Sequence, residues 1–206
     1  MIITNVVPKR KGLSALYIDG EFALKIDTET FLVSRFSVGD EITDSELKEL
    51  IESSNEKRAK EKALWLISYR DHSKKELTDK IRKTADKDSA IKAVERLEEL
   101  GLVNDEKFAR TYAEKLLLNK KLSKKGAKYK LLEKGIDREL AEEILDEYQV
   151  EPREQIREII ESKYKSSLAD EKGKRRAVSA LQRKGFSWSD IRAVLEEYTE
   201  DESYEI

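Results

Sequence analysis

The side chains of this sequence that could do chemistry are basic, and they are clustered. Between positions 115 and 134 the chain carries eight lysines and one glutamate, and between 163 and 184 it carries eight lysines and arginines against two acidic residues. Strongly acidic stretches follow both clusters. Ammonium and guanidinium groups placed along a helix can bind nucleic-acid phosphates, with an affinity that falls as salt rises. An acidic protein surface could bind the same groups.

Most of the candidate contact residues lie on the second helix that we predict in each of three repeats, and Lys120 and Lys121 lie at the end of the predicted first helix of the second repeat. The candidates are Lys74, Lys75, Lys120, Lys121, Lys124, Lys125, Lys128, Lys172, Lys174, Arg175, Arg176 and Arg183. Like charges four residues apart, such as Lys124 and Lys128, destabilise a helix by about 0.2–0.5 kcal/mol, and a bound anion would relieve this. The alternative is that these faces only solubilise the protein, or that neighbouring acidic helices neutralise them.

A catalytic or metal-binding pattern is absent from the sequence. There is no cysteine, and the single histidine, His72, lies at a helix junction where a solvated or capping role is expected. No Gly-rich phosphate loop, zinc-ligand spacing or Ser-His-Asp pattern occurs. We therefore expect no enzyme, no catalytic residues, no cofactor and no metal ion.

The aromatic residues are expected to be structural. Tyr129 is the one aromatic side chain within the basic segment "SKKGAKYKLLEK", which does not favour a base-stacking platform. The others with helical neighbours are expected in the core, namely Trp65, Tyr69, Phe108, Tyr112 and Trp188.

An internal repeat of about fifty residues positions the basic clusters. "KGIDRELAEEILDEY" at 134 is echoed by "KGFSWSDIRAVLEEY" at 184, and a shift of fifty aligns Ile91 with Ala141 and Ile191. Each unit reads as three helices, with Gly135 and Gly185 in the turn between the second and third helix. Ala85 takes that place in the first unit, so the turn there must differ or be strained.

The fold class that follows is mainly α, a tandem array of three three-helix, helix-turn-helix-like repeats after a small N-terminal β region. In "LYIDGEFALKI", residues alternate around Asp19 and Gly20, which predicts a hairpin. "IITNVV" can add a third strand, and Thr43 with Glu46 forms a capping box before a long helix. The predicted domains are 1–43 (β region), 44–101 (first repeat with its lead-in helix), 102–150 (second repeat) and 151–206 (third repeat with an acidic tail).

The composition narrows the setting in which the protein acts. The absence of cysteine is typical of a reducing compartment, and no apolar run approaches membrane-spanning length. We expect a cytoplasmic monomer with no membrane partner. The tail from Glu196 onward is acidic and could compete with phosphates for the basic helices.

Three stretches resemble the RecX family, bacterial regulators of the RecA recombinase. These stretches, "ALWLISYRDHSKKEL", "GLVNDEKFARTYAE" and "KKGAKYKLLEKGID", match in order and spacing over residues 57 to 199. The specific residues are Arg70, Ser73, Glu76 and Leu77, then Asn104, Asp105, Phe108 and Ala109, then Lys125, Gly126, Leu132, Gly135 and Ile136.

The resemblance implies a curved chain of three-helix units that lies in the groove of the RecA filament and restrains ATP hydrolysis and strand exchange. Its implied partners are the RecA filament and DNA, single-stranded and within that filament. Two other classes of function stay open, a helix-turn-helix DNA-binding regulator and a protein-only scaffold. The third helices of the last two units are acidic, which argues against their use as recognition helices in the major groove of DNA.

Overall fold

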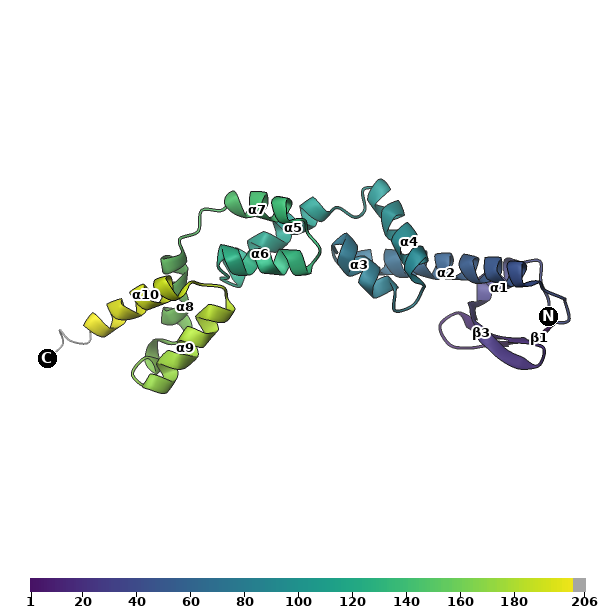
Figure 1. Ribbon diagram of the computed structural model, residues 1–206, viewed down its shortest axis with the longest axis horizontal. Coiled ribbons are helices and arrows are strands. Elements are labelled where there is room, and N and C mark those ends of the chain that lie inside the picture. Colours follow the sequence, from purple (N-terminus) through teal and green to yellow (C-terminus); the bar gives the residue numbers. More distant parts are fainter. Residues whose placement is uncertain (202–206) are drawn as a thin grey trace. The chain divides into compact units, whose positions relative to one another are not determined.

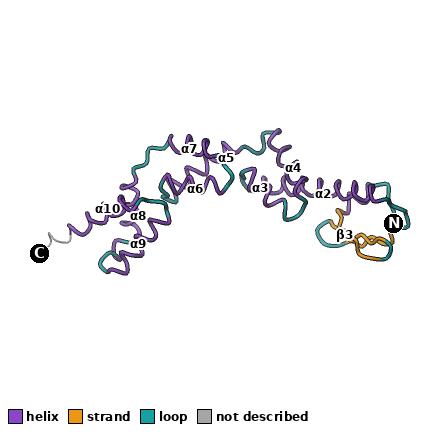
Figure 2. The backbone as a smooth tube through the Cα atoms, in the orientation of Figure 1, coloured by secondary structure: helices purple, strands orange, loops and turns teal. Residues whose placement is uncertain are grey.

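The computed structural model describes residues 1–201 and contains two compact units, one from Met1 to Asn104 and one from Asp105 onward. Helices predominate in both units, and the strands are confined to the segment before α1 (Figures 1 and 2). Three three-helix domains follow one another along the chain after a small three-stranded sheet. The predicted fold class is therefore confirmed.

The sheet is antiparallel in the order β1-β2-β3, with β1 at Ile3–Pro8, β2 at Leu13–Ile18 and β3 at Glu21–Asp27. Asp19 and Gly20 connect β2 to β3 with φ angles of 50° and 88°, the left-handed pair that a two-residue type I′ turn requires. The predicted hairpin and third strand are both confirmed. Apolar side chains of the sheet pack on the short helix α1 (Thr28–Val33) and on the start of α2.

The helix α2 (Asp44–Ile67) belongs to two hydrophobic cores. It begins with the predicted capping box, in which the Thr43 hydroxyl accepts from the Glu46 backbone N–H and the Glu46 carboxylate accepts from the Thr43 N–H. Leu50 near its start packs with the sheet. Ala59 and Ala63 further along pack with α3 (Lys74–Ile81) and α4 (Lys87–Glu99), which complete the first three-helix domain.

The turn between α3 and α4 differs from its counterparts and is not strained. The cap of α4, Asp86, follows Ile81 by five residues, whereas Asp137, the cap of α7 (Arg138–Asp146), follows Leu131 by six. The shorter turn needs no left-handed residue, and Ala85 does not have a positive φ.

Because the turn between α3 and α4 is one residue shorter than its counterparts, the alignment by fifty residues is wrong by one residue on α4. Ala90 is fully buried and lies at the position of Ala141, while the expected equivalent, Ile91, is only half-buried. Gly135 and Gly185 have φ angles of 80° and 88°, as predicted for the other two turns.

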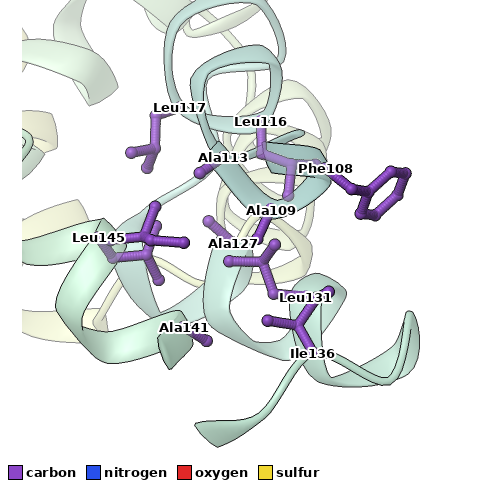
Figure 3. Packing of buried hydrophobic residues seen from close by; sticks show 11 residues of the cluster. Phe108, Ala109, Ala113, Leu116, Leu117, Ala127, Leu131, Ile136, Ala141 and Leu145 are labelled. Atoms are coloured by element: carbon purple, nitrogen blue, oxygen red, sulfur yellow. The ribbon is translucent and has the colours of Figure 1, made fainter. Parts of the chain in front are cut away.

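The second three-helix domain consists of α5 (Asp105–Glu114), α6 (Lys124–Glu133) and α7. A π-helical turn, η1 (Lys115–Asn119), extends α5. Figure 3 shows Ala113 and Leu117 from α5 and η1 packed near Ala127 and Leu145 from α6 and α7. The third domain consists of α8 (Pro152–Lys163), the short 3₁₀ turn η2 (Lys165–Ser167), α9 (Glu171–Arg183) and α10 (Trp188–Asp201).

Two expectations about single residues were wrong. Phe108 is buried and Tyr112 packs beside it, but Trp65, Tyr69 and Trp188 are 51%, 70% and 56% exposed. On α2 the inward helical positions are occupied by small residues and Leu66, which leaves Trp65 and Tyr69 on an outer face.

His72 is buried rather than solvated.

The idea that the acidic tail competes for the basic helices concerns residues 200 to 206, most of which lie outside the described residues.

Candidate anion-binding surface

The helix α9 carries a dense group of cations. It begins after Asp170, whose carboxylate accepts from the Gly173 N–H, and its apolar side chains Ala177 and Leu181 face the core of the third domain. A side chain at position 173 would place its Cβ 1.8 Å from the Ser167 carbonyl oxygen, so only glycine lets α9 pack directly on η2. The basic positions of α9 are left on its outer face.

Four of these basic side chains line one open hollow of about 540 Å³. Its lining residues are Tyr164, Lys172, Arg175, Arg176, Ser179 and Arg183. Within the described residues none of the four cations forms an ion pair. The fifth candidate on this helix, Lys174, lies 4.0 Å from Glu171 and does not line the hollow. The hollow therefore offers converging positive charge to an anion from outside.

Lys121, in the loop before α6, and two lysines of α6 have acidic partners. Lys121 pairs with Glu158 at 2.7 Å, Lys124 with Asp146 at 3.6 Å, and Lys128 with Glu142. The Lys128 ammonium, followed by the Arg138 guanidinium, holds the pKa of Glu142 below its usual range. For these three lysines the neutralisation that we gave as the alternative is what the structure shows.

The remaining candidates are Lys120 and Lys125 in the second domain and Lys74 and Lys75 on α3. Lys120 and Lys125 form no ion pair with any described residue. On α3, Lys74 pairs with Glu98 of α4 at 2.9 Å, and Lys75 is exposed in the first turn. All twelve residues could be identified as candidates from the sequence. Which of these cations lie beside acidic side chains of another helix could not be predicted from it.

A joint between the second and third domains places Lys120 near the third domain. The Ser123 N–H donates to the Lys184 carbonyl at 3.1 Å, and the Lys184 ammonium donates to the Lys120 carbonyl. A Cβ at Gly126 would lie 2.2 Å from the Lys184 carbonyl oxygen, so the backbones meet through glycine. Burial, followed by the charges of Lys163 and Lys120, lowers the pKa of Lys184.

Lys163, Tyr164 and Lys184 also lie at this surface, and they were not among the predicted contact residues. The charge count included the two lysines, but only the fold shows that they adjoin α9 and the joint. A second contact at the joint is equally hidden in the sequence, because the Gln155 amide donates to the Leu117 carbonyl of the π-helical turn at 3.1 Å.

Neither a metal centre nor a membrane-spanning helix is found among the described residues. No group of three or more acidic or histidine side chains there is arranged to hold a metal ion. No helix in the described part of the chain is long and apolar enough to cross a membrane.

Comparisons with known proteins agree with this architecture. Models of the first, second and third three-helix domains of RecX match residues 59–97, 104–145 and 150–195. Regulatory protein RecX of Caldanaerobacter subterraneus subsp. tengcongensis is 31% identical over 95% of this chain and 98% of its own length. Regulatory protein RecX of Bacillus subtilis is 29% identical over 98% of this chain and 80% of its own.

Solved structures have the same fold. A crystal structure of regulatory protein RecX superposes with a TM-score of 0.59 at 18% identity, covering 95% of this chain and 98% of its own. RecX from Lactobacillus salivarius gives 0.56 at 25% identity, covering 71% and 98%. Since all three domain models match and a relative more than 30% identical aligns over nearly the whole length, this chain belongs to the RecX family of regulatory proteins.

Proposed function

We propose that this protein regulates the RecA recombinase by lying in the groove of the RecA–DNA filament, where it restrains ATP hydrolysis and strand exchange. Membership of the RecX family supports the choice of RecA as the target. The protein acts without catalysis of its own, as a cytoplasmic monomer. Its domains are those that the repeat predicts, with boundaries near residues 43, 101 and 150.

The observation that carries the proposal is the hollow of α9. Lys172, Arg175, Arg176 and Arg183 converge there without an acidic partner among the described residues. Keeping four like charges together costs stability unless an anion compensates them. A filament groove supplies such anions, both as DNA phosphates and as acidic side chains of the recombinase.

The charge of the third helices disfavours a helix-turn-helix DNA-binding regulator. In that mode the third helix of a domain would enter the major groove of duplex DNA. The outward side chains of α7 include Glu139, Glu142 and Glu143, which would face phosphates there. A protein-only scaffold could bind an acidic protein surface in the hollow, so salt-dependent binding to a bare oligonucleotide distinguishes it from the proposed function.

The direct test measures RecA ATP hydrolysis on single-stranded DNA while this protein is titrated. We expect hydrolysis to slow at ratios of one protein per RecA or fewer, because one bound molecule restrains neighbouring subunits of a filament. Strand exchange, measured in parallel, should slow over the same range. Unchanged rates across the whole titration would contradict the proposal.

A further inference from the structure

A stripe of two cations and two aromatic rings runs along the outer face of α2 in the first unit. It consists of Arg58, Lys62, Trp65 and Tyr69, spaced by four, three and four residues. With 3.6 residues per turn these positions lie within one narrow strip, about 17 Å long. Tyr69 directly follows the last turn of the helix.

Arg58 and Lys62 form no ion pair with any described residue. Two other cations of the same helix behave differently, because Lys57 pairs with Asp27 at 3.1 Å and Lys48 lies 3.8 Å from Glu52. The stripe therefore carries two positive charges that no described carboxylate neutralises.

The aromatic rings form an exposed platform next to these charges. The Lys62 ammonium lies 3.8 Å from the centre of the Trp65 ring, and the Trp65 and Tyr69 rings meet edge to face with centres 4.7 Å apart. Both rings are more than half exposed. The core positions of this helix are filled by Ala59, Ala63 and Leu66, so burial of the rings is not needed for packing.

We infer that this stripe binds single-stranded nucleic acid, with Trp65 and Tyr69 stacking against bases and Arg58 and Lys62 contacting phosphates. Proteins that hold single strands combine these two features, because every base has a π-face and every linkage has a charge. An acidic protein surface would use the cations but would leave the exposed platform unexplained. The inference deepens the proposed function. It rests on that function only in taking the bound nucleic acid to be the single strand within the RecA filament.

Fluorescence of Trp65 tests the stacking contact on bare DNA, without RecA. The chain has two tryptophans, so the variant Trp188→Phe leaves Trp65 as the sole reporter. Titration with oligo(dT) should quench its emission, whereas an abasic phosphodiester strand of the same length should bind more weakly and quench little. Equal quenching by both strands, or none by either, would overturn the stacking assignment.

Substitutions test the same contact independently. Tyr69→Ala, at a largely exposed position, should weaken oligo(dT) binding at least fivefold, since a stacked base contributes about 1–3 kcal/mol. The double change of Arg58 and Lys62 to Gln should reduce the salt dependence of binding by about 1.4 in slope. Lys48→Gln, which removes a paired cation of the same helix, is the control and should change neither quantity.

The outcomes separate this inference from the proposed function. If Tyr69→Ala and Trp65→Ala leave oligo(dT) binding intact but abolish the effect on RecA hydrolysis, the stripe is a protein contact and the inference is wrong. If oligo(dT) binds as expected but RecA hydrolysis is never affected, the inference stands and the proposed function fails. Thermal unfolding of each variant verifies that the first unit is folded.

Discussion

His72 is a buried titratable side chain whose two ring nitrogens both have polar neighbours. Its Nδ1 lies 2.9 Å from the Arg70 carbonyl and its Nε2 lies 3.0 Å from the Lys80 ammonium. Because a carbonyl only accepts and an ammonium only donates, this geometry fits a neutral ring with its proton on Nδ1. A second proton on Nε2 would face Lys80 directly.

The expected consequence is a low pKa for His72 and a loss of stability in acid. Burial lowers this pKa, and the charges of Arg70 and Lys80 lower it further against the opposing backbone hydrogen bond and Glu76. The unfolded chain takes up the proton first, near pH 6.5. The stabilisation is therefore complete above pH 6.5 and declines as pH falls below it towards the folded pKa.

This prediction is simple to measure because His72 is the only histidine. Its ring proton signals in NMR should titrate with a midpoint below 6.5, and urea unfolding of the first unit should become easier between neutral and mildly acidic pH. His72→Gln should remove part of that pH dependence. A midpoint at or above 6.5 would instead indicate a solvated ring, one of the two roles that the sequence suggested.

At the scale of elements, α6 and α9 have similar charge but different surroundings. Replacing Lys172, Arg175, Arg176 and Arg183 by Gln should weaken binding to single-stranded DNA and reduce its salt slope by up to about 3. Thermal stability should hold or rise, because the like-charged pair of Lys172 and Arg176 is removed and Gln is a good helix former.

The matched control, the α6 variant, replaces Lys124 and Lys128 of α6 and Lys121 of the loop before it by Gln. These lysines are engaged with Glu158, Asp146 and Glu142, so binding should change much less. Stability should fall slightly, by about 1 kcal/mol or less per exposed pair. If the α6 variant loses as much binding as the α9 variant, the ion pairs open on binding and the contrast between the helices has no functional meaning.

At the scale of the whole molecule, local rules predicted the elements better than their contacts. The hairpin at Asp19 and Gly20, the cap at Thr43 and the left-handed glycines Gly135 and Gly185 depend on neighbouring residues only, and the structure has them all. The acidic partners of α6, the outward Trp65 and the π-helical turn after α5 depend on packing between helices. A single sequence does not specify that packing.

The joint between the second and third domains is such a contact, and it is our last prediction. Gly126→Ala should open the joint, because the new methyl group would lie 2.2 Å from the Lys184 carbonyl oxygen, a backbone atom, and the backbone must shift to relieve this contact. Overpacking of this kind costs about 1–3 kcal/mol, against the roughly 1 kcal/mol by which alanine favours a helix. Hydrogen exchange reports the result, since the Ser123 amide donates to Lys184 across the joint.

We expect the Ser123 amide to lose protection in Gly126→Ala while Leu131, inside the second core, keeps it. Lys125→Ala, at an exposed neighbouring position without an ion pair among the described residues, is the control and should leave Ser123 protected. Restraint of RecA hydrolysis should need more of the Gly126 variant, because the hollow of α9 is no longer held at a fixed distance from Lys120. Preserved protection with full potency would mean that the backbone shifts to accept the methyl group and that the joint tolerates a side chain.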